Sequence, residues 1–279
     1  MKASLTQLLV HLDASSRAAQ RLEVACKLGH RHGAAIAALY AVKPSFVERP
    51  FAPEVGPGVA AALREIDDEQ LSRARALFEQ SQAASGIHAS WAEVRDDPII
   101  AAFAQQALYA DLLVLGQHDP SDTQSAHVAA DFAETVMAIS GKPALILPYA
   151  AVPPAVGEIV VIAWKPTREA ARAVAAAMPL LQGARQVHVV SWASEEAVIG
   201  GEPLDLNGCL KLHGVVATWH RQGEEPEELG EQLLSRAFDL EADLLVMGCY
   251  GHSRAREWLL GGTSRVVLRS MTLPVLMAH

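Results

Sequence analysis

The chain has 279 residues, of which 51% are hydrophobic and 20% charged, a composition that fits one or two globular domains and excludes a disordered chain. Lys and Arg total 23 against 32 Asp and Glu, which gives a net charge of −9; this balance disfavours a nucleic-acid partner or attachment to anionic lipid. Three cysteines without metal or redox spacing, and no apolar run of about 18 residues, indicate a soluble protein of the reducing cytoplasm with no membrane span.

The first half of the chain alternates short apolar runs with helical patterns. The pattern predicts strands at 7–12, 34–42, 87–94, 111–116 and 144–147. It predicts helices from Ser15 or Ser16 to about residue 31, over 65–84, after Asp97-Pro98 and over 127–140. Gly33 is expected to end the first of these helices.

The second half repeats this order. Strands are predicted at 158–164, 186–192, 215–221, 243–248 and 275–277, and helices at 167–178, 226–240 and 263–270. Continuous apolar strands separated by helices favour a parallel sheet that is covered on both faces. We therefore predict an α/β protein of two tandem, doubly wound, five-stranded domains, in which ligands bind beyond the carboxyl ends of the strands.

Sequence repeats indicate that the two halves arose by duplication. The heptad ADLLVLG at 110–116 returns 132 residues later as ADLLVMG at 242–248, and GIHASW at 86–91 returns 128 residues later as GVVATW at 214–219. Prolines near residue 153 mark a linker, so the predicted domains are 1–150 and 151–279. The offsets also indicate that the second copy lost about 22 residues between its second and third strands. Trp91 and Trp219 recur at one place in the third strand, which suggests core or interface packing.

A glycine-rich loop follows the fourth strand of the second copy. Gly248, Gly251 and Gly261 have the spacing G-x2-G-x9-G, and Gly262-Thr263-Ser264 then begins a helix. Glycines let a ligand approach the backbone, and a helix N-terminus favours an anion. Residues 248–270 contain four arginines and one glutamate. This local charge of +3 favours a phosphate site, although the glycines of a tight connection beside solvated arginines would give the same pattern.

The loop resembles the nucleotide-binding signature of the universal stress protein family, and residues 163–174 and 273–277 are also similar to that family. The resemblance covers nearly the whole chain. It implies an adenine nucleotide α-hydrolase-like fold and a pseudo-dimer in which the domains pair through their last strands. It also implies binding of ATP, ADP or AMP, with or without magnesium, and a role in stress tolerance.

The resemblance assigns site residues in the second copy. It places Gly248, Gly251 and Gly261 around the ribose and phosphates, with Met247 and His252 beside them. Gly262 stands where the family usually has Ser or Thr, and the hydroxyls of Thr263 and Ser264 follow. The family also carries an Asp at the end of the first strand.

That position differs between the copies. Asp13 matches the family in the first copy, whereas the second has Lys165 there, or Trp164 if the alignment slips by one residue. The first copy keeps only Gly116 of the glycine signature, and its loop contains Asp119, Asp122 and Asp131. Carboxylates repel phosphates, so we expect the first site to be degenerate and to hold no nucleotide.

Three functions remain open from the sequence. The leading hypothesis is a signalling module whose second domain binds an adenine nucleotide without rapid turnover. A slow ATPase or nucleotidyl-transfer enzyme at the same site is the second, and a nucleotide-free protein-interaction module is the third. No catalytic set or metal-ligand spacing stands out. Besides the internal pairing of domains, a homodimer of chains is an open expectation.

Overall fold

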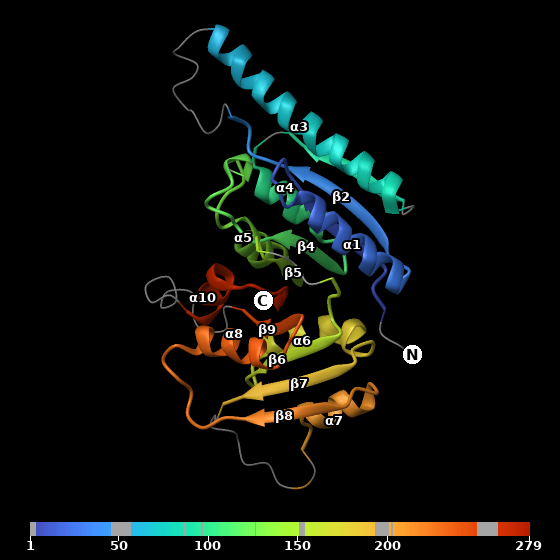
Figure 1. The fold of residues 1–279 in the computed structure, drawn as a ribbon, viewed down its shortest axis with the longest axis vertical. Helices are drawn as coiled ribbons and strands as arrows, with labels where there is room; N and C mark the ends of the chain where they lie inside the picture. Colours follow the sequence, from blue (N-terminus) through green and yellow to red (C-terminus); the bar gives the residue numbers. More distant parts are fainter. Residues whose placement is uncertain are drawn as a thin grey trace. The chain divides into compact units, whose positions relative to one another are not determined.

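The computed structural model describes residues 4–45, 57–85, 88–95, 97–125, 127–150, 154–192, 201, 203–249 and 262–279. The chain divides into two compact units, Leu5–Tyr149 and Ala150–His279. We call them the first unit and the second unit and describe each by itself (Figure 1).

The sheet of the first unit is parallel throughout. Its described strands are β1 (Gln7–Leu12), β2 (Ala35–Ala41), β3 (Ala89–Val94), β4 (Leu112–Gly116) and β5 (Ala144–Leu147). They lie in the order β3-β2-β1-β4-β5. The chain order reverses between β1 and β4, so the carboxyl ends of these two strands flank the position where doubly wound sheets bind ligands.

Helices cover this sheet on both faces. They are α1 (Ala18–His32), α3 (Pro57–Ser85), α4 (Ile99–Ala107) and α5 (Phe132–Ser140), with a 3-10 turn at Thr123–Ser125. Helix α1 packs against α3, and α4 packs against α5. Gly33 ends α1 in the left-handed conformation, with φ of 66°, as the sequence predicts.

The second unit repeats the topology. Its strands are β6 (Ile159–Trp164), β7 (Gln186–Ser191), β8 (Ala217–Arg221), β9 (Leu244–Gly248) and β10 (Val275–Ala278). They lie parallel in the order β10-β9-β6-β7-β8, with the reversal between β6 and β9. The described helices are α6 (Arg168–Leu181), α7 (Leu206–Leu212), α8 (Leu229–Asp239) and α10 (Thr263–Ser270).

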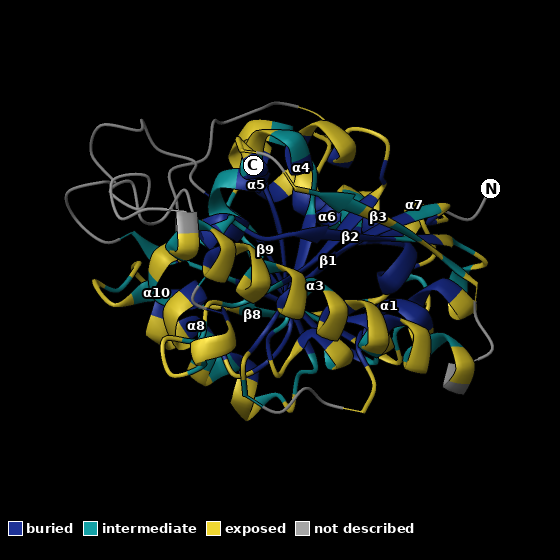
Figure 2. Ribbon diagram, turned by 90° about the horizontal axis from the view of Figure 1, so that it is seen from above, coloured by how far each residue is buried: buried dark blue, intermediate teal, exposed yellow. Residues whose placement is uncertain are grey.

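The strands supply most of each core. Figure 2 shows them buried, while the helices turn one exposed side to solvent. In the first unit Leu112, Leu113 and Val114 are fully buried, and in the second Val160, Val161 and Ile162 are too. Runs of consecutive buried residues are expected in strands that are covered on both faces. The predicted fold class of two tandem five-stranded α/β domains is therefore confirmed for the described residues.

Helix boundaries depart from the sequence pattern in a few places. Helix α3 begins at Pro57 and not near residue 65, and proline is well tolerated in the first turn of a helix. Helix α7 was not predicted; its N-cap Asp205 accepts a hydrogen bond from the backbone N–H of Gly208 at 2.6 Å. No helix in the described residues is long and apolar enough to cross a membrane.

Candidate functional site

The candidate site of the second unit lies at the reversal point, beyond β6 and β9. Met247 and Gly248 end β9, Lys165 directly follows β6, and Gly262, Thr263 and Ser264 begin α10. Each of these residues therefore stands at or next to the carboxyl edge of the sheet. The predicted site residues Gly251, His252 and Gly261 lie outside the described residues.

Gly248 is required by the packing of the strand end. A Cβ atom at this position would lie 2.5 Å from the backbone nitrogen of Ala170 and 2.7 Å from the carbonyl carbon of Glu169. Both neighbours are backbone atoms of the first turn of α6 and cannot turn away. The glycine thus lets α6 approach the end of β9, which is a structural reason for glycine alongside the predicted approach of a ligand.

The N-terminus of α10 has features that suit an anion. Gly262 occupies the N-cap position, and no side chain caps the helix. Thr263 and Ser264 are the first two residues of the helix, so their hydroxyls lie in its first turn. Thr263 is half-buried and Ser264 is buried. Arg265 and Arg269 lie on the same helix and carry positive charge. The helix dipole, the hydroxyls and the arginines all favour a negatively charged group at this end.

The strand register identifies the residue that corresponds to Asp13. In the first unit Leu8 pairs with Leu112, and in the second Val160 pairs with Leu244, so Asp13 and Lys165 each stand one residue beyond the first strand. The Lys165 ammonium contacts the Glu225 carboxylate at 2.7 Å. Both side chains are more than a third exposed, and such pairs contribute little to stability. Lys165 therefore can exchange this partner for another anion at small cost.

A pocket that the sequence analysis did not identify lies beside these residues. It has a volume of about 650 Å³ and is lined by Trp164, Pro166, Ser191, Trp192, Asp205, Leu206, Asn207, Trp219, Arg221 and Gln222. Its walls come from the carboxyl ends of β6, β7 and β8 and from the start of α7. The Arg221 guanidinium lies 5.6 Å from the centre of the Trp219 ring. The sequence signal was the placement of a tryptophan at or near the end of three adjacent strands.

The recurring tryptophans have different surroundings in the two units. Trp91 packs under α3, with its ring 5.1 Å from that of Phe78 and 6.2 Å from that of Tyr40. The predicted core packing is therefore confirmed for Trp91. Trp219 has the same place in the strand register but lines an open pocket and not the core; the alternative of interface packing stays a prediction for Trp219.

In the first unit, the Asp13 carboxylate forms an ion pair and hydrogen bonds with neighbouring residues. The Arg21 guanidinium donates to its carboxylate at 2.6 Å, and the N–H and hydroxyl of Ser15 donate to the same oxygen at 3.0 and 2.5 Å. Asp13 and Arg21 are each about 4% exposed. Burial would raise the pKa of Asp13, but the charge of Arg21, then His11 and the Ser15 hydrogen bonds, hold this pKa below its usual value.

The Arg21 side chain also reaches the end of β4. A Cβ atom on Gly116 would lie 2.4 Å from a guanidinium nitrogen of Arg21. Arg21 Nε further donates to the carbonyl of His11 at 3.1 Å. Arg21 thus fills the space between the carboxyl ends of β1 and β4, the place where a doubly wound sheet receives a ligand.

The acidic loop of the first unit is tied down by hydrogen bonds. Asp122 accepts from both the N–H and the hydroxyl of Ser16 at 2.9 Å, which fastens the loop to the turn before α1. The carbonyl of His127 accepts from the N–H of Lys43 at 3.0 Å, just beyond β2. Asp119 accepts from Ser121 within the loop, and Asp131 accepts from Thr135 in α5. The carboxylates that set this loop apart in the sequence therefore serve its own structure.

Two further observations on the described residues concern cysteine and metal chemistry. Cys249 is 1% exposed, and its backbone N–H donates to the carbonyl of Ala278, which fits a packed cysteine. Among the described residues, no group of three or more His, Cys, Asp or Glu side chains is arranged to hold a metal ion.

The comparisons with known proteins agree with the observed fold. The family model described as "Universal stress protein family" matches residues 5–148 and again 157–279. The chain therefore belongs to the universal stress protein family and contains two tandem copies of its domain. A search of curated proteins found no match.

Some solved structures resemble the chain over nearly its whole length, and others match about half of it. A universal stress protein from Archaeoglobus fulgidus DSM 4304 has a TM-score of 0.70 at 18% identity, covering 98% of this chain and 95% of that one. A putative universal stress protein from Pseudomonas aeruginosa UCBPP-PA14 has a TM-score of 0.55 at 17% identity, covering 98% and 92%. A universal stress protein in complex with cAMP covers 53% of this chain and all of its own, at 17% identity and a TM-score of 0.36.

Removing the guanidinium of Arg21 should destabilise the first unit strongly. Arg21→Met leaves the Asp13 carboxylate buried without its counter-charge, and losses from such single removals are about 3–5 kcal/mol. The double variant Asp13→Asn/Arg21→Met should recover most of that loss, because no buried charge remains. Urea unfolding of the wild type, the single variants Arg21→Met and Asp13→Asn, and the double variant measures this coupling; additive effects of the two single changes would contradict it.

His11 should make the protein sensitive to mild acid. Burial, opposed by the charge of Asp13, lowers the pKa of His11 from 6.5 to about 4, and its ring stacks on Phe132 with centroids 4.2 Å apart. In the unfolded chain the His11 imidazole binds a proton below about pH 6.5, whereas in the folded state it stays neutral down to about pH 4. The free energy of unfolding should therefore fall over this window by about 3 kcal/mol on account of His11.

The variant His11→Gln tests this pH dependence. Glutamine cannot be protonated but can still donate to the carbonyl of Ala41, which lies 2.9 Å from His11 Nε2. Urea unfolding at pH 7 and pH 4 should show a smaller loss for the variant than for the wild type. His213→Gln, at an exposed histidine, is the matched control and should keep the wild-type loss. Equal losses in all three proteins would contradict the assignment to His11.

Proposed function

We propose that the second unit binds an adenine nucleotide at the carboxyl edge of its sheet, and that this binding serves a stress-response or signalling role without rapid turnover. The base would stack in the tryptophan pocket, and the phosphates would meet the N-terminus of α10. ATP, ADP and AMP, with or without magnesium, are the ligands we expect. The proposed cellular place of this function is the cytoplasm.

The tryptophan pocket is the observation that carries the proposal. Its volume of about 650 Å³ falls in the range of small-molecule sites, roughly 300–1,000 Å³. Trp164, Trp192 and Trp219 offer flat apolar faces to a base, and stacking on aromatic side chains contributes about 1–3 kcal/mol for each base. Polar groups of Arg221 and Gln222 stand on the same walls and can orient a ligand.

The start of α10 supplies a separate subsite of opposite chemistry. Helix α10 follows β9, so it begins at the carboxyl edge of the sheet. The tryptophan pocket lies at the same edge. Aromatic walls for a base and a helix N-terminus for phosphates are the two elements that a nucleotide needs. We assign phosphate contacts to Gly262, Thr263 and Ser264. Contacts with the ribose and phosphates are assigned to Gly248, Gly251 and Gly261, with Met247, His252 and Lys165 beside them.

The asymmetry of the units supports binding in the second one. In the first unit the reversal point contains the buried Asp13–Arg21 pair, and Asp122 holds the loop over the turn that precedes α1. In the second unit the corresponding position carries Lys165, half-exposed in an ion pair that contributes little. We therefore propose one nucleotide for each chain.

A slow ATPase at this site is the second candidate, and a nucleotide-free interaction module is the third. The internal pairing of the two units through their last strands, and a homodimer of chains, stay predictions. Phosphate release from ATP by the wild type, lost in variants that no longer bind the nucleotide, would favour the ATPase over the other two.

Isothermal titration calorimetry with ATP, ADP, AMP and cAMP tests the proposal. We expect at least one adenine nucleotide to bind with a stoichiometry of one. Trp219→Ala should weaken binding by about tenfold or more, because one stacking face is lost. Ser264→Ala should also weaken the binding of the nucleotide, because a hydroxyl contact with phosphate is lost. Ser270→Ala, at the exposed far end of α10, should leave the affinity unchanged. Absence of heat with every nucleotide up to about 1 mM would refute the proposal.

A further inference from the structure

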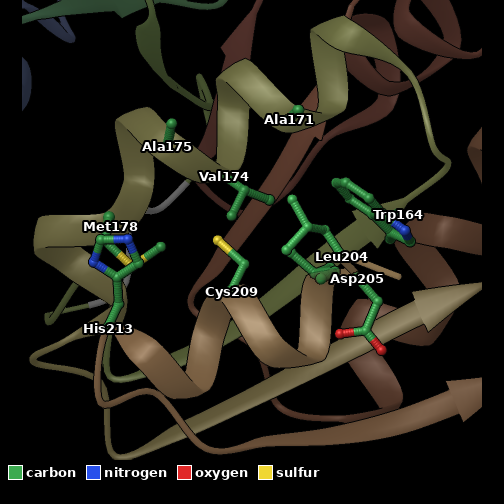
Figure 3. A pocket seen from close by; sticks show the side chains of 10 residues that line it. Trp164, Ala171, Val174, Ala175, Met178, Leu204, Asp205, Cys209 and His213 are labelled. Carbon is green, nitrogen blue, oxygen red and sulfur yellow. The ribbon is translucent and has the colours of Figure 1, made fainter. Parts of the chain in front are cut away.

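A second cavity lies between α6 and α7, next to the tryptophan pocket. It has a volume of about 390 Å³ and is lined by Trp164, Ala171, Val174, Ala175, Met178, Leu204, Asp205, Leu206, Cys209 and His213 (Figure 3). Most of these side chains are apolar. Trp164, Asp205 and Leu206 belong to both cavities, so the two spaces share a wall.

The cavity lies where the described part of the second unit has a short helix and the first unit has a long one. In the first unit, α1 is covered by α3, a helix of 29 residues. Ala74 of α3 packs on Tyr40 and Val42, and Phe78 covers Trp91. In the described part of the second unit, the helix beside α6 is α7, which has 7 residues. The apolar side chains of α6 therefore line a cavity beside this short helix.

The shape of the cavity follows helix α6. Ala171, Val174, Ala175 and Met178 have the spacing i, i+3, i+4 and i+7, which places them in one stripe along the helix. Seven residues of helix rise about 10 Å. The wall is therefore a narrow apolar strip about two turns long, which matches an unbranched hydrocarbon chain better than a compact polar molecule. Leu204, fully exposed, stands at the edge of the same cavity.

Polar groups mark the two ends of the strip. In Figure 3, Asp205 lies beside Trp164 and Leu204 at one end, and His213 lies beside Met178 at the other. The Asp205 carboxylate already accepts the N-cap hydrogen bond of α7. Its negative charge would repel the carboxylate of a ligand. His213 is the C-cap residue of α7 and lines the cavity, and its ring can donate a hydrogen bond to a carboxylate, while Lys211 stands in the last turn of the same helix.

We propose that this cavity binds a medium-chain carboxylate, with the hydrocarbon chain along α6 and the carboxylate at the His213 end. The volume of about 390 Å³ lies within the range of ligand sites. This site differs from the proposed nucleotide site, and its occupancy does not require a nucleotide.

Cys209 provides a reporter for the bound chain. It is exposed and lines the cavity, whereas Cys26 and Cys249 are buried. Bound decanoate should therefore slow the reaction of Cys209 with 5,5′-dithiobis(2-nitrobenzoate) by about tenfold at saturation. Calorimetry on the same protein should give one decanoate for each chain. Absence of binding up to about 1 mM, or binding without protection of Cys209, would overturn the proposal.

Two matched variants separate this cavity from other surfaces. Ala171→Trp fills the strip from an exposed position on α6, and it should weaken decanoate binding by about tenfold or more. Ala19→Trp makes the same change at an exposed position of α1 and should leave the affinity for decanoate unchanged. Circular dichroism confirms that both variants are folded. Equal affinities of the two variants for decanoate would assign the binding elsewhere and overturn the proposal.

Discussion

The buried pair between Asp13 and Arg21 determines which copy of the domain has room for a ligand. Both copies end their fourth strand with a glycine that faces the helix after the first strand: Gly248 is required by the backbone of α6, and Gly116 leaves space for the guanidinium of Arg21. In the first unit the approaching group is the Arg21 side chain, whose charge is neutralised by Asp13 at 2.6 Å. A buried charge without its partner is costly, so Arg21 and Asp13 hold each other at the reversal point of the sheet.

The described helix that follows the second strand is much shorter in the second unit than in the first. Helix α3 covers one face of the first unit and buries Trp91, whereas the second unit has the short α7 beside α6. The tryptophan pocket and the apolar cavity both border α7. Apolar side chains therefore line the tryptophan pocket and the cavity beside α7, whereas in the first unit Phe78 of α3 packs on Trp91. Among the described residues, the two copies of the fold thus differ clearly in the helix that follows their second strand.

The sequence predicted the architecture well because the architecture depends on repeated local signals. Buried parallel strands appear as continuous apolar runs such as 112–115 and 244–247, and the repeated heptads align the two halves. The family and the two tandem copies were recognised from the same motifs and are confirmed by the family match.

The local chemistry was less predictable because it depends on contacts between distant residues. Nothing in the sequence shows that Arg21 on α1 reaches Asp13 and Gly116, or that Gly248 is needed by the backbone of Ala170. Helix α7 is only seven residues long and carries a weak pattern. Trp164, Trp192 and Trp219 are separated by up to 55 positions in the chain, and they share a pocket only because their strands are neighbours in the sheet.

Native mass spectrometry with an excess of adenine nucleotide tests the asymmetry of the two units most directly. The account predicts one bound nucleotide for each 29.8 kDa chain, because Arg21 fills the first site and binding is proposed in the second unit alone. The count should stay at one in variants that alter only the first unit's loop, such as Asp122→Asn. Two nucleotides for each chain would contradict the central claim that the first copy has lost its ligand space.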